Sequence, residues 1–426
     1  MATANTSSMQ PQVEDQWLLL LSFLPQGWQA AAKSLRAFIR KRAVTSADVL
    51  LRLIFAYAWN DWSLRTTAAW AARLDLADLS DVALLQRFRH ASAWLGYLVD
   101  SWFREHGVVP PVARFPLVLV DGCTVQEPGS TTTTWRLHAQ WDLPSKRFSG
   151  IELTDKHGAE SLTRLRLQPG DVVLSDRNFA KPGPLQWVQD QKAYIISRVG
   201  WNALRWETLD GQPWDLLAAV RTLADGEAGS WTVQIRTAKD RPPLQLRLIA
   251  RRKPPAAAEQ SRRQARQEAK RHGHTPKAGT LEAADYLLVL TTLPETMATN
   301  EEILALYRLR WQIECAFKRL KSLIHIDYLR AFDPDLAQTY LLAKILGALL
   351  ADTIRTHGAA VPSGDSPSSL VSSAPWRYTQ MIWSDLCTII RGGVDLTEWL
   401  TRTRRRWARH LHERPRKRQL QYDRGP

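Results

Sequence analysis

The chain has 426 residues, of which 45% are hydrophobic, and it carries a formal net charge of +15. This length is enough for two or three domains with cores, and the excess of Lys and Arg favours a polyanionic partner, usually nucleic acid, over a merely solvated basic surface. Three cysteines without metal-type spacing do not fit a disulfide scaffold. No stretch reaches the ~18 apolar residues of a membrane span, and the polar first 15 residues lack a signal-peptide core. We therefore expect a cytoplasmic protein with no membrane contact.

Residues 1–110 have the periodicity of helices. Ser46 is placed to cap one helix, and a second helix is expected over residues 63–71. After a break at residues 75–81, a further helix has a polar side made of Gln86, Arg87, Arg89 and His90. Two helices of which the second carries Arg are compatible with a helix-turn-helix DNA reader, although any small helical bundle gives the same pattern.

The pattern changes in residues 111–199, where short apolar runs indicate strands. Two of these runs end in an acid, at Asp121 and at Asp176. The expected strands cover residues 115–121, 135–141, 148–153, 171–176 and 193–199, with helices over 159–167 and 182–191. This order predicts a mixed α/β sheet with flanking helices.

Residues 200–295 interrupt that alternation and predict a β-rich insertion into the core domain. Strand composition occurs over residues 231–236, 244–250 and 286–292. Between the last two lies a basic flap, residues 251–277, with nine Lys or Arg residues against Glu259 and Glu268. Its composition is typical of an exposed loop or a frayed helix that could contact phosphates or simply be solvated.

Residues 296–358 return to the core domain with a long helix around Glu314. One side of this helix is an apolar stripe made of Leu306, Leu309, Ile313, Phe317, Leu320 and Ile324. Beside it, a second stripe carries Tyr307, Arg310, Glu314 and Lys321. A carboxylate flanked by cations and a phenol suits phosphate chemistry better than it suits a solvated surface.

The last segment, residues 359–426, is expected to form a helical C-terminal region with a basic tail. Residues 362–375 are rich in Ser and Pro and indicate a loop. Residues 402–418 hold nine Lys or Arg residues against Glu413 alone. Such a tail is suited to sequence-independent contacts with DNA phosphates.

Asp121, Asp176 and Glu314 together form a candidate catalytic and metal site. Adjacent strand ends and a flanking helix of a compact sheet can converge, but three close carboxylates do not all stay ionised unaided. Two Mg²⁺ or Mn²⁺ ions between them would relieve the repulsion and would favour phosphodiester displacement. Taken singly, an acid at a strand end is most often a turn residue, so the prediction depends on all three acids.

Three motifs resemble the signatures of bacterial insertion-sequence transposases of the DDE type. They are Asp121-Gly122-Cys123-Thr124, Ser175-Asp176-Arg177-Asn178-Phe179, and Tyr307-x2-Arg310-x3-Glu314-x6-Lys321. The third motif matches its family pattern at all four positions and is highly specific. The resemblance covers roughly residues 40–350 and implies a ribonuclease-H-like core with an inserted β subdomain.

The resemblance also implies roles for individual residues. Asp121, Asp176 and Glu314 would hold two metal ions, and Tyr307, Arg310 and Lys321 would contact phosphates near the cut, to which we add Arg177 and Lys318. Where the family often has a Trp that holds a flipped base, this chain has Tyr286, which could equally be an ordinary strand aromatic.

The expected function is therefore that of a nucleoid-associated bacterial transposase. It would bind the terminal inverted repeats of an insertion element as double-stranded DNA, pair two ends as a homodimer, cut them and join the 3′ ends to target DNA. Two alternatives remain open: a metal-dependent endonuclease of the same fold that does not join, and a DNA-binding repressor with an inactive core.

Overall fold

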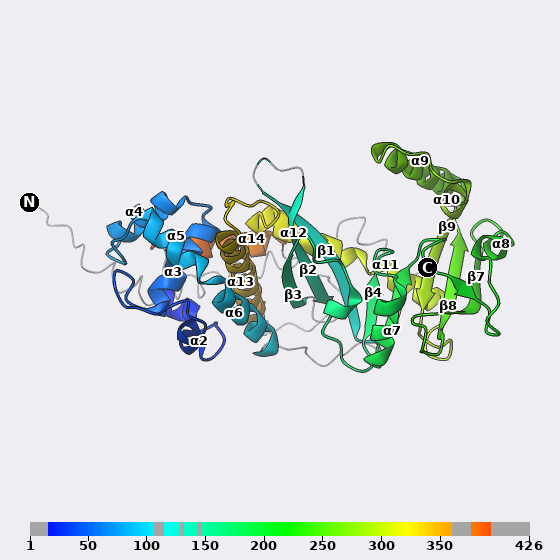
Figure 1. Cartoon of the computed structure of the whole chain (residues 1–426), viewed down its shortest axis with the longest axis horizontal. Helices are drawn as coiled ribbons and strands as arrows, with labels where there is room; N and C mark the ends of the chain where they lie inside the picture. Colours follow the sequence, from blue (N-terminus) through cyan, green and yellow to red (C-terminus); the bar gives the residue numbers. More distant parts are fainter. Residues whose placement is uncertain are drawn as a thin grey trace, which may run out of the picture. The chain divides into compact units, whose positions relative to one another are not determined.

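The computed structural model describes residues 16–105, 115–127, 129, 132–143, 147–359 and 376–392. The chain divides into two compact units. The helical unit comprises residues 1–107, 124–136 and 316–426, and the sheet unit comprises residues 108–123 and 137–315 (Figure 1). The Ser/Pro-rich segment 362–375 and the basic tail 402–418 lie outside the described residues.

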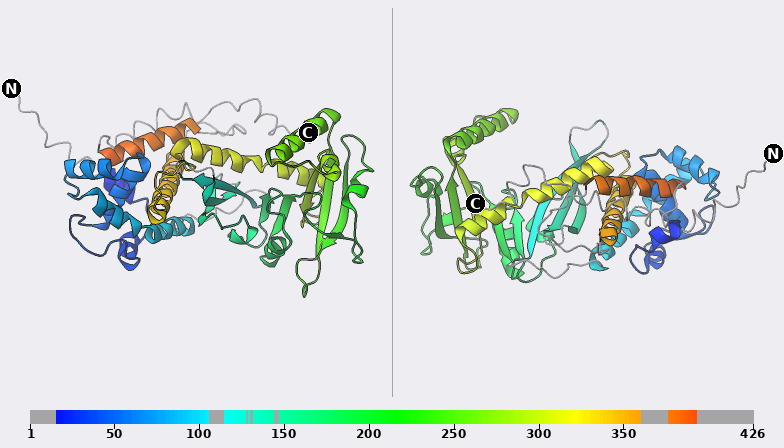
Figure 2. Two further views of the ribbon diagram at one scale, coloured as in Figure 1. Left: turned by 45° about the horizontal axis from the view of Figure 1, so that its top comes forward. Right: turned by 180° about the vertical axis from the view of Figure 1, so that it is seen from behind.

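The helical unit is built around two apolar helices that are far apart in sequence. Its helices are α2 (Trp28–Ser34), α3 (Ala47–Trp59), α4 (Leu64–Arg73), α5 (Asp81–Arg89), α6 (Ser92–Glu105), α13 (Pro334–Ala359) and α14 (Trp376–Arg391). α3 is buried from Leu50 to Trp59, and α13 packs against α3, α6 and α14. In both views of Figure 2, α13 lies among the blue N-terminal helices. The apolar segment 340–354, expected in the catalytic core, therefore completes the core of the helical unit.

Serine caps fix where three of these helices begin. The hydroxyl oxygens of Ser46, Ser63 and Ser80 accept hydrogen bonds from the backbone N–H groups of Val49, Thr66 and Ala83, at 3.0–3.2 Å. Each bond satisfies one of the donors that the first turn of a helix leaves unpaired. The helix expected after Ser46 is confirmed, as are those expected over 63–71 and after residue 81.

The α4–α5 pair differs from a typical helix-turn-helix reader. Residues 74–80 separate the two helices, whereas such readers use three or four residues. Arg89 of α5 pairs with Asp333 at 2.5 Å, so this guanidinium has a structural role in the helical unit. Gln86 and His90 remain exposed on the same helix.

Strands of the sheet unit belong to one nine-stranded sheet with the order β3-β2-β1-β4-β5-β9-β8-β7-β6. The strands are β1 (Leu117–Gln126), β2 (Thr133–Asp142), β3 (Arg147–Asp155), β4 (Val172–Ser175), β5 (Tyr194–Arg198), β6 (Trp206–Glu207), β7 (Ala228–Ile235), β8 (Leu244–Arg252) and β9 (Tyr286–Thr291). β1, β4 and β5 are parallel, and β5, β9, β8, β7 and β6 pair antiparallel. The expected α/β fold with a mixed sheet is confirmed.

The β-rich insertion is continuous with the core sheet. β9 pairs with β5 through Ile196 and Thr291, which adds the strands of residues 200–295 to the edge of the parallel strands β1, β4 and β5. α8 (Leu216–Val220) and α10 (Ala278–Ala283) accompany these strands. The basic flap forms a 17-residue helix, α9 (Pro255–Arg271), between β8 and α10 (Figure 1).

Two helical expectations need correction. Residues 159–167 contain only the 3₁₀ turn η1 (Leu162–Arg164), because Arg166 pairs with the Gln140 side chain through both of its backbone groups at 2.9 Å, which holds the segment extended. The expected long helix around Glu314 is two helices, α11 (Asn300–Arg308) and α12 (Trp311–Ile324). At the break, the N–H groups of Leu309 and Arg310 bond three residues back, as in a 3₁₀ turn. The helix expected over 182–191 is confirmed as α7 (Pro182–Asp190).

Candidate active site

Asp121 lies on β1, and Asp176 directly follows the neighbouring parallel strand β4. Leu119 of β1 pairs with Leu174 of β4, so the same register continued by two residues brings Asp121 level with Asp176. Neighbouring strands lie about 4.8 Å apart, and residues in register on parallel strands present their side chains to the same face. The sheet therefore brings these two carboxylates together.

The strand β1 does not end at Asp121, contrary to expectation. It continues to Gln126, with Cys123 and Val125 buried and Thr124 exposed. This alternation is typical of a strand with one solvated face. Asp121 is therefore held within a strand, where its Oδ1 accepts a hydrogen bond from the Gly122 N–H at 2.9 Å.

Asp176 directly follows β4 and organises the turn after it. Its Oδ1 accepts a hydrogen bond from the Asn178 N–H at 2.8 Å, and its carbonyl accepts from the Ser197 hydroxyl at 3.1 Å. Ser197 also accepts a bond from Ser175 at 2.8 Å. These bonds fix the backbone of the second motif.

The charge on Glu314 acts on Asp121. The pKa of Asp121 is raised to about 6, first by burial and also by the negative charges of Asp176 and Glu314, against the opposing effects of the Gly122 N–H and of Arg310. Asp176 and Glu314 therefore lie close enough to Asp121 for their charges to change its pKa.

Arg310 is the counter-ion of Glu314. Their side chains, four residues apart across the start of α12, form an ion pair. The Arg310 side chain is 17% exposed, and it also contacts Tyr307, whose pKa is raised by burial. Three residues of the expected polar stripe are thus connected, with Arg310 in contact with both Tyr307 and Glu314.

The three carboxylates have the oxygen atoms that a divalent cation binds, although they are not gathered into a coordination site. Within the described part of the chain, no three His, Cys, Asp or Glu side chains are gathered closely enough to hold a metal ion. Asp121, Asp176 and Glu314 offer only oxygen, which suits Mg²⁺ or Mn²⁺ better than Zn²⁺. The raised pKa of Asp121 has burial as its main cause, with a smaller contribution from the negative charges of Asp176 and Glu314. A cation would compete with Arg310 for Glu314.

The other basic residues predicted to contact DNA lie on two different segments, Arg177 after β4 and Lys318 and Lys321 on α12. Arg177 is exposed and pairs with Glu268 of α9 at 3.3 Å, so the helix of the basic flap touches the second motif. Lys318 and Lys321 follow Glu314 by about one and two turns of α12. Lys318 is exposed and Lys321 is half-buried.

Tyr286 begins β9 and belongs to the hydrophobic core of the sheet unit. It is 5% exposed, so a base could stack on its ring only after a rearrangement. Its position favours the interpretation as an ordinary strand aromatic.

A fourth carboxylate near the site was missed in the sequence. A Cβ atom built on Gly122 would lie 2.4 Å from an Oε of Glu160, which places this side chain against the residue that follows Asp121. Glu160 lies in the segment between β3 and η1, with no motif around it. The one sequence feature that could have indicated this contact was Gly122, because a residue without a side chain leaves space for the Glu160 carboxylate.

Comparisons with known proteins agree with this geometry. Residues 117–350 match the family described as "Transposase DDE domain". The putative transposase InsL for insertion sequence element IS186A of Escherichia coli is 39% identical over 347 residues, covering 80% of this chain and 94% of the relative. The transposase for insertion sequence element IS421 of Escherichia coli is also 39% identical, over 348 residues with the same coverage.

More distant matches cover less of the sequence or are less similar. The transposase for insertion sequence element IS231F of Bacillus thuringiensis subsp. israelensis is 24% identical over 241 residues, 51% of this chain and 49% of the relative. A piggyBac transposase synaptic complex with hairpin DNA, solved by cryo-electron microscopy, has a TM-score of 0.45 and 10% identity, covering 95% of this chain and 86% of that chain. That last likeness is too distant to carry an argument.

The site and the comparisons agree on the chemistry of the chain. A DDE domain implies dependence on a divalent metal ion and activity on DNA, and the matched residues 117–350 include Asp121, Asp176 and Glu314. Among the described residues, no helix is long and apolar enough to cross a membrane. With a family match over more than half of its length and close relatives over four fifths of it, the chain belongs to the DDE transposases of bacterial insertion sequences.

Proposed function

We propose that Asp121, Asp176 and Glu314 bind two Mg²⁺ or Mn²⁺ ions and that this site cuts the ends of an insertion element and joins them to target DNA. The observation that carries the proposal is the effect of the charges of Asp176 and Glu314 on the pKa of Asp121, together with the parallel pairing of β1 and β4 just before the two Asp residues. When bound, such ions would activate water or a 3′-OH and would stabilise the attacking and leaving oxygens of a phosphodiester.

The protein's own side chains have separate roles in this proposal. β1 and β4 hold Asp121 and Asp176 at a fixed spacing, and α12 brings Glu314 to them. Arg310 neutralises Glu314 before DNA binds, and it would turn to a phosphate oxygen once a cation takes over that role. A guanidinium suits both partners because its paired N–H donors match carboxylate and phosphate alike.

DNA contacts outside the acids would come from the basic residues around the site. Arg177, Lys318 and Lys321 would contact backbone phosphates, as would the exposed Lys and Arg residues of α9. These contacts are salt-dependent and carry little sequence information. We further propose that recognition of the terminal inverted repeats involves the helical unit and that two chains pair two ends as a homodimer.

Incubation of the purified chain with DNA of its own element ends tests this proposal. With Mg²⁺ we expect cleavage at the element boundary followed by joined products with a target plasmid, and without Mg²⁺ we expect binding only. Cleavage without any joined product would indicate an endonuclease. Binding with no cleavage in Mg²⁺ or Mn²⁺ would indicate an inactive core and would overturn the catalytic assignment.

A further inference from the structure

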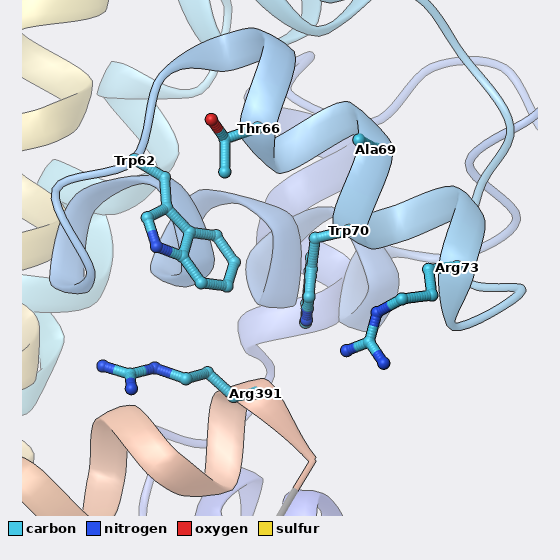
Figure 3. Close-up of a pocket in the computed structure, with 6 residues that line it drawn as sticks. All are labelled: Trp62, Thr66, Ala69, Trp70, Arg73 and Arg391. Carbon is cyan, nitrogen blue, oxygen red and sulfur yellow. The ribbon is translucent and has the colours of Figure 1, made fainter.

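A pocket of about 380 Å³ in the helical unit has no role in the chemistry described above. It is lined by Trp62, Thr66, Ala69, Trp70, Arg73 and Arg391. Figure 3 shows the two indole rings beside the gap, on α4 and on the turn before it, while Arg391 reaches across from the end of α14. The volume is within the range of ligand sites, about 300–1,000 Å³.

The aromatic wall of this pocket is available for stacking. The rings of Trp62 and Trp70 lie 5.7 Å apart and are tilted by 59°. Trp62 is half-buried, so part of its ring faces the gap. Trp70 is 6% exposed, and its enclosed indole N–H has no acceptor among the described residues. A buried donor without an acceptor is uncommon in folded proteins.

The turn that carries Trp62 is held rigidly by helices from the C-terminal part of the chain. Asp61 has a φ of 54°, which non-glycine residues rarely adopt, and its carboxylate pairs with the buried Lys344 at 2.8 Å and with the Tyr340 hydroxyl. The Trp62 N–H bonds to the Tyr57 carbonyl at 3.2 Å. The backbone that carries Trp62 is therefore held in place without a ligand.

The pocket also has two cationic residues, Arg73 on the same helix as Trp70 and Arg391 on α14. No carboxylate lines the pocket, and neither Arg73 nor Arg391 forms an ion pair with a described residue. Arg391 donates from Nε to the side-chain oxygen of Asn60 at 2.6 Å, which fixes the stem and leaves its terminal nitrogens for a ligand. Arg73 is exposed at the end of α4. Two guanidinium groups without a counter-ion favour an anion.

From this combination we propose that the pocket binds one unpaired nucleotide of a DNA strand. The base stacks on Trp62, and its phosphate lies between Arg73 and Arg391. Aromatic side chains hold unstacked bases of any sequence in this way, and basic groups follow the strand's phosphates. The inference rests on the DNA-binding function proposed above, to which it adds a preference for ends or distorted sites with an unpaired base.

Affinity for two forms of one element end tests the pocket. The full chain is titrated, without divalent metal, against a blunt duplex and against the same duplex with a three-nucleotide single-stranded overhang. Stacking of one base predicts about tenfold tighter binding of the overhang form. Both Trp62→Ala and Arg73→Ala should remove this preference and leave the affinity for the blunt duplex within about twofold.

Arg65→Ala is the matched control, because Arg65 is also exposed on α4 but pairs with Asp81, outside the pocket. This variant should keep the preference. Photocrosslinking locates the base directly: 5-iododeoxyuridine in the overhang should crosslink to the peptide that contains Trp62 and Trp70, and the same base in the duplex body should not.

Three results would overturn the inference. They are equal affinity of the unchanged chain for both DNA forms, a crosslink that maps elsewhere, and displacement of the overhang DNA from the pocket by equimolar deoxynucleoside monophosphate, which would indicate a free-nucleotide site. Tight binding of both DNA forms with no preference would leave the proposed transposase function intact. Failure to bind either form would count against that function as well.

Discussion

Replacing Asp121 by Asn should stabilise the metal-free protein at neutral and alkaline pH. The carboxyl of Asp121 has its pKa raised from 3.8 to about 6 by burial and by the neighbouring acids. An acid with a raised pKa in the folded state favours folding while it is protonated. That contribution is lost as the pH rises from about 4 to about 6. Above pH 6 the ionised group opposes folding.

The size of the effect follows from the same shift. The difference between 3.8 and about 6 corresponds to about 3 kcal/mol between the two protonation states. Asn has nearly the same shape, carries no charge, and its side-chain oxygen can keep the bond from the Gly122 N–H. We therefore expect up to about 3 kcal/mol of added unfolding free energy at pH 8 in a chelator and no difference at pH 4.

Denaturant unfolding at pH 4, 6 and 8 in the presence of a chelator measures this effect. Asp190→Asn is the matched control, since Asp190 is exposed, pairs with Arg241 and has its pKa lowered by that partner; this change should give no stabilisation. An Asp121→Asn protein that is equally or less stable than the unchanged chain at pH 8 would refute the electrostatic account. Added Mg²⁺ should then stabilise the unchanged chain more than the variant.

Three further substitutions test the packing around the site and in the helical unit. Gly122→Ala inserts a Cβ against the carboxylate end of the flexible Glu160 side chain, which can swing aside, and should change the unfolding free energy by no more than about 1 kcal/mol, read from the denaturant midpoint; a larger loss would mean that Glu160 is held rigidly in place. Lys344→Met leaves Asp61 without its buried partner and should cost about 3 kcal/mol, measured by thermal unfolding; unchanged stability would show that the ion pair is not needed. Thr299→Ala removes the capping box of α11 and should cost about 1 kcal/mol; calorimetry that shows no change would contradict the role of the cap.

Most strands and helices could be predicted from local patterns. Apolar runs with turn residues at their ends predicted β4, β5 and β9, and the cap at Ser46 predicted where α3 begins. Such signals depend on neighbouring residues, which a sequence contains directly.

Features set by distant partners could not be predicted. The extended backbone near Arg166 depends on Gln140, and the continuation of β1 beyond Asp121 depends on its place beside β2. The assignment of α13 to the helical unit depends on the apolar faces of other helices that pack against it. Because α13 is apolar on most of its sides, its sequence does not indicate which side faces a core.

The candidate site was predictable in its main parts because its motifs have specific spacings. Tyr307, Arg310 and Glu314 lie at helical intervals, and the contacts among them follow from that spacing. Glu160 and the Trp62 pocket were missed, since neither has a motif and both are assembled from separate segments. The basic flap was predicted by its charge, but its contact with Arg177 required the folded chain.

The central claim is that Asp121, Asp176 and Glu314 act together in metal-dependent DNA cleavage. The most direct measurement is the rate of Mg²⁺-dependent cleavage of element-end DNA by Asp121→Asn, Asp176→Asn and Glu314→Gln, with the exposed Asp240→Asn as control. We expect each of the three to lose cleavage by more than about a thousandfold while binding end DNA normally, and the control to cut at the full rate. Cleavage at an undiminished rate by any of the three would contradict the account.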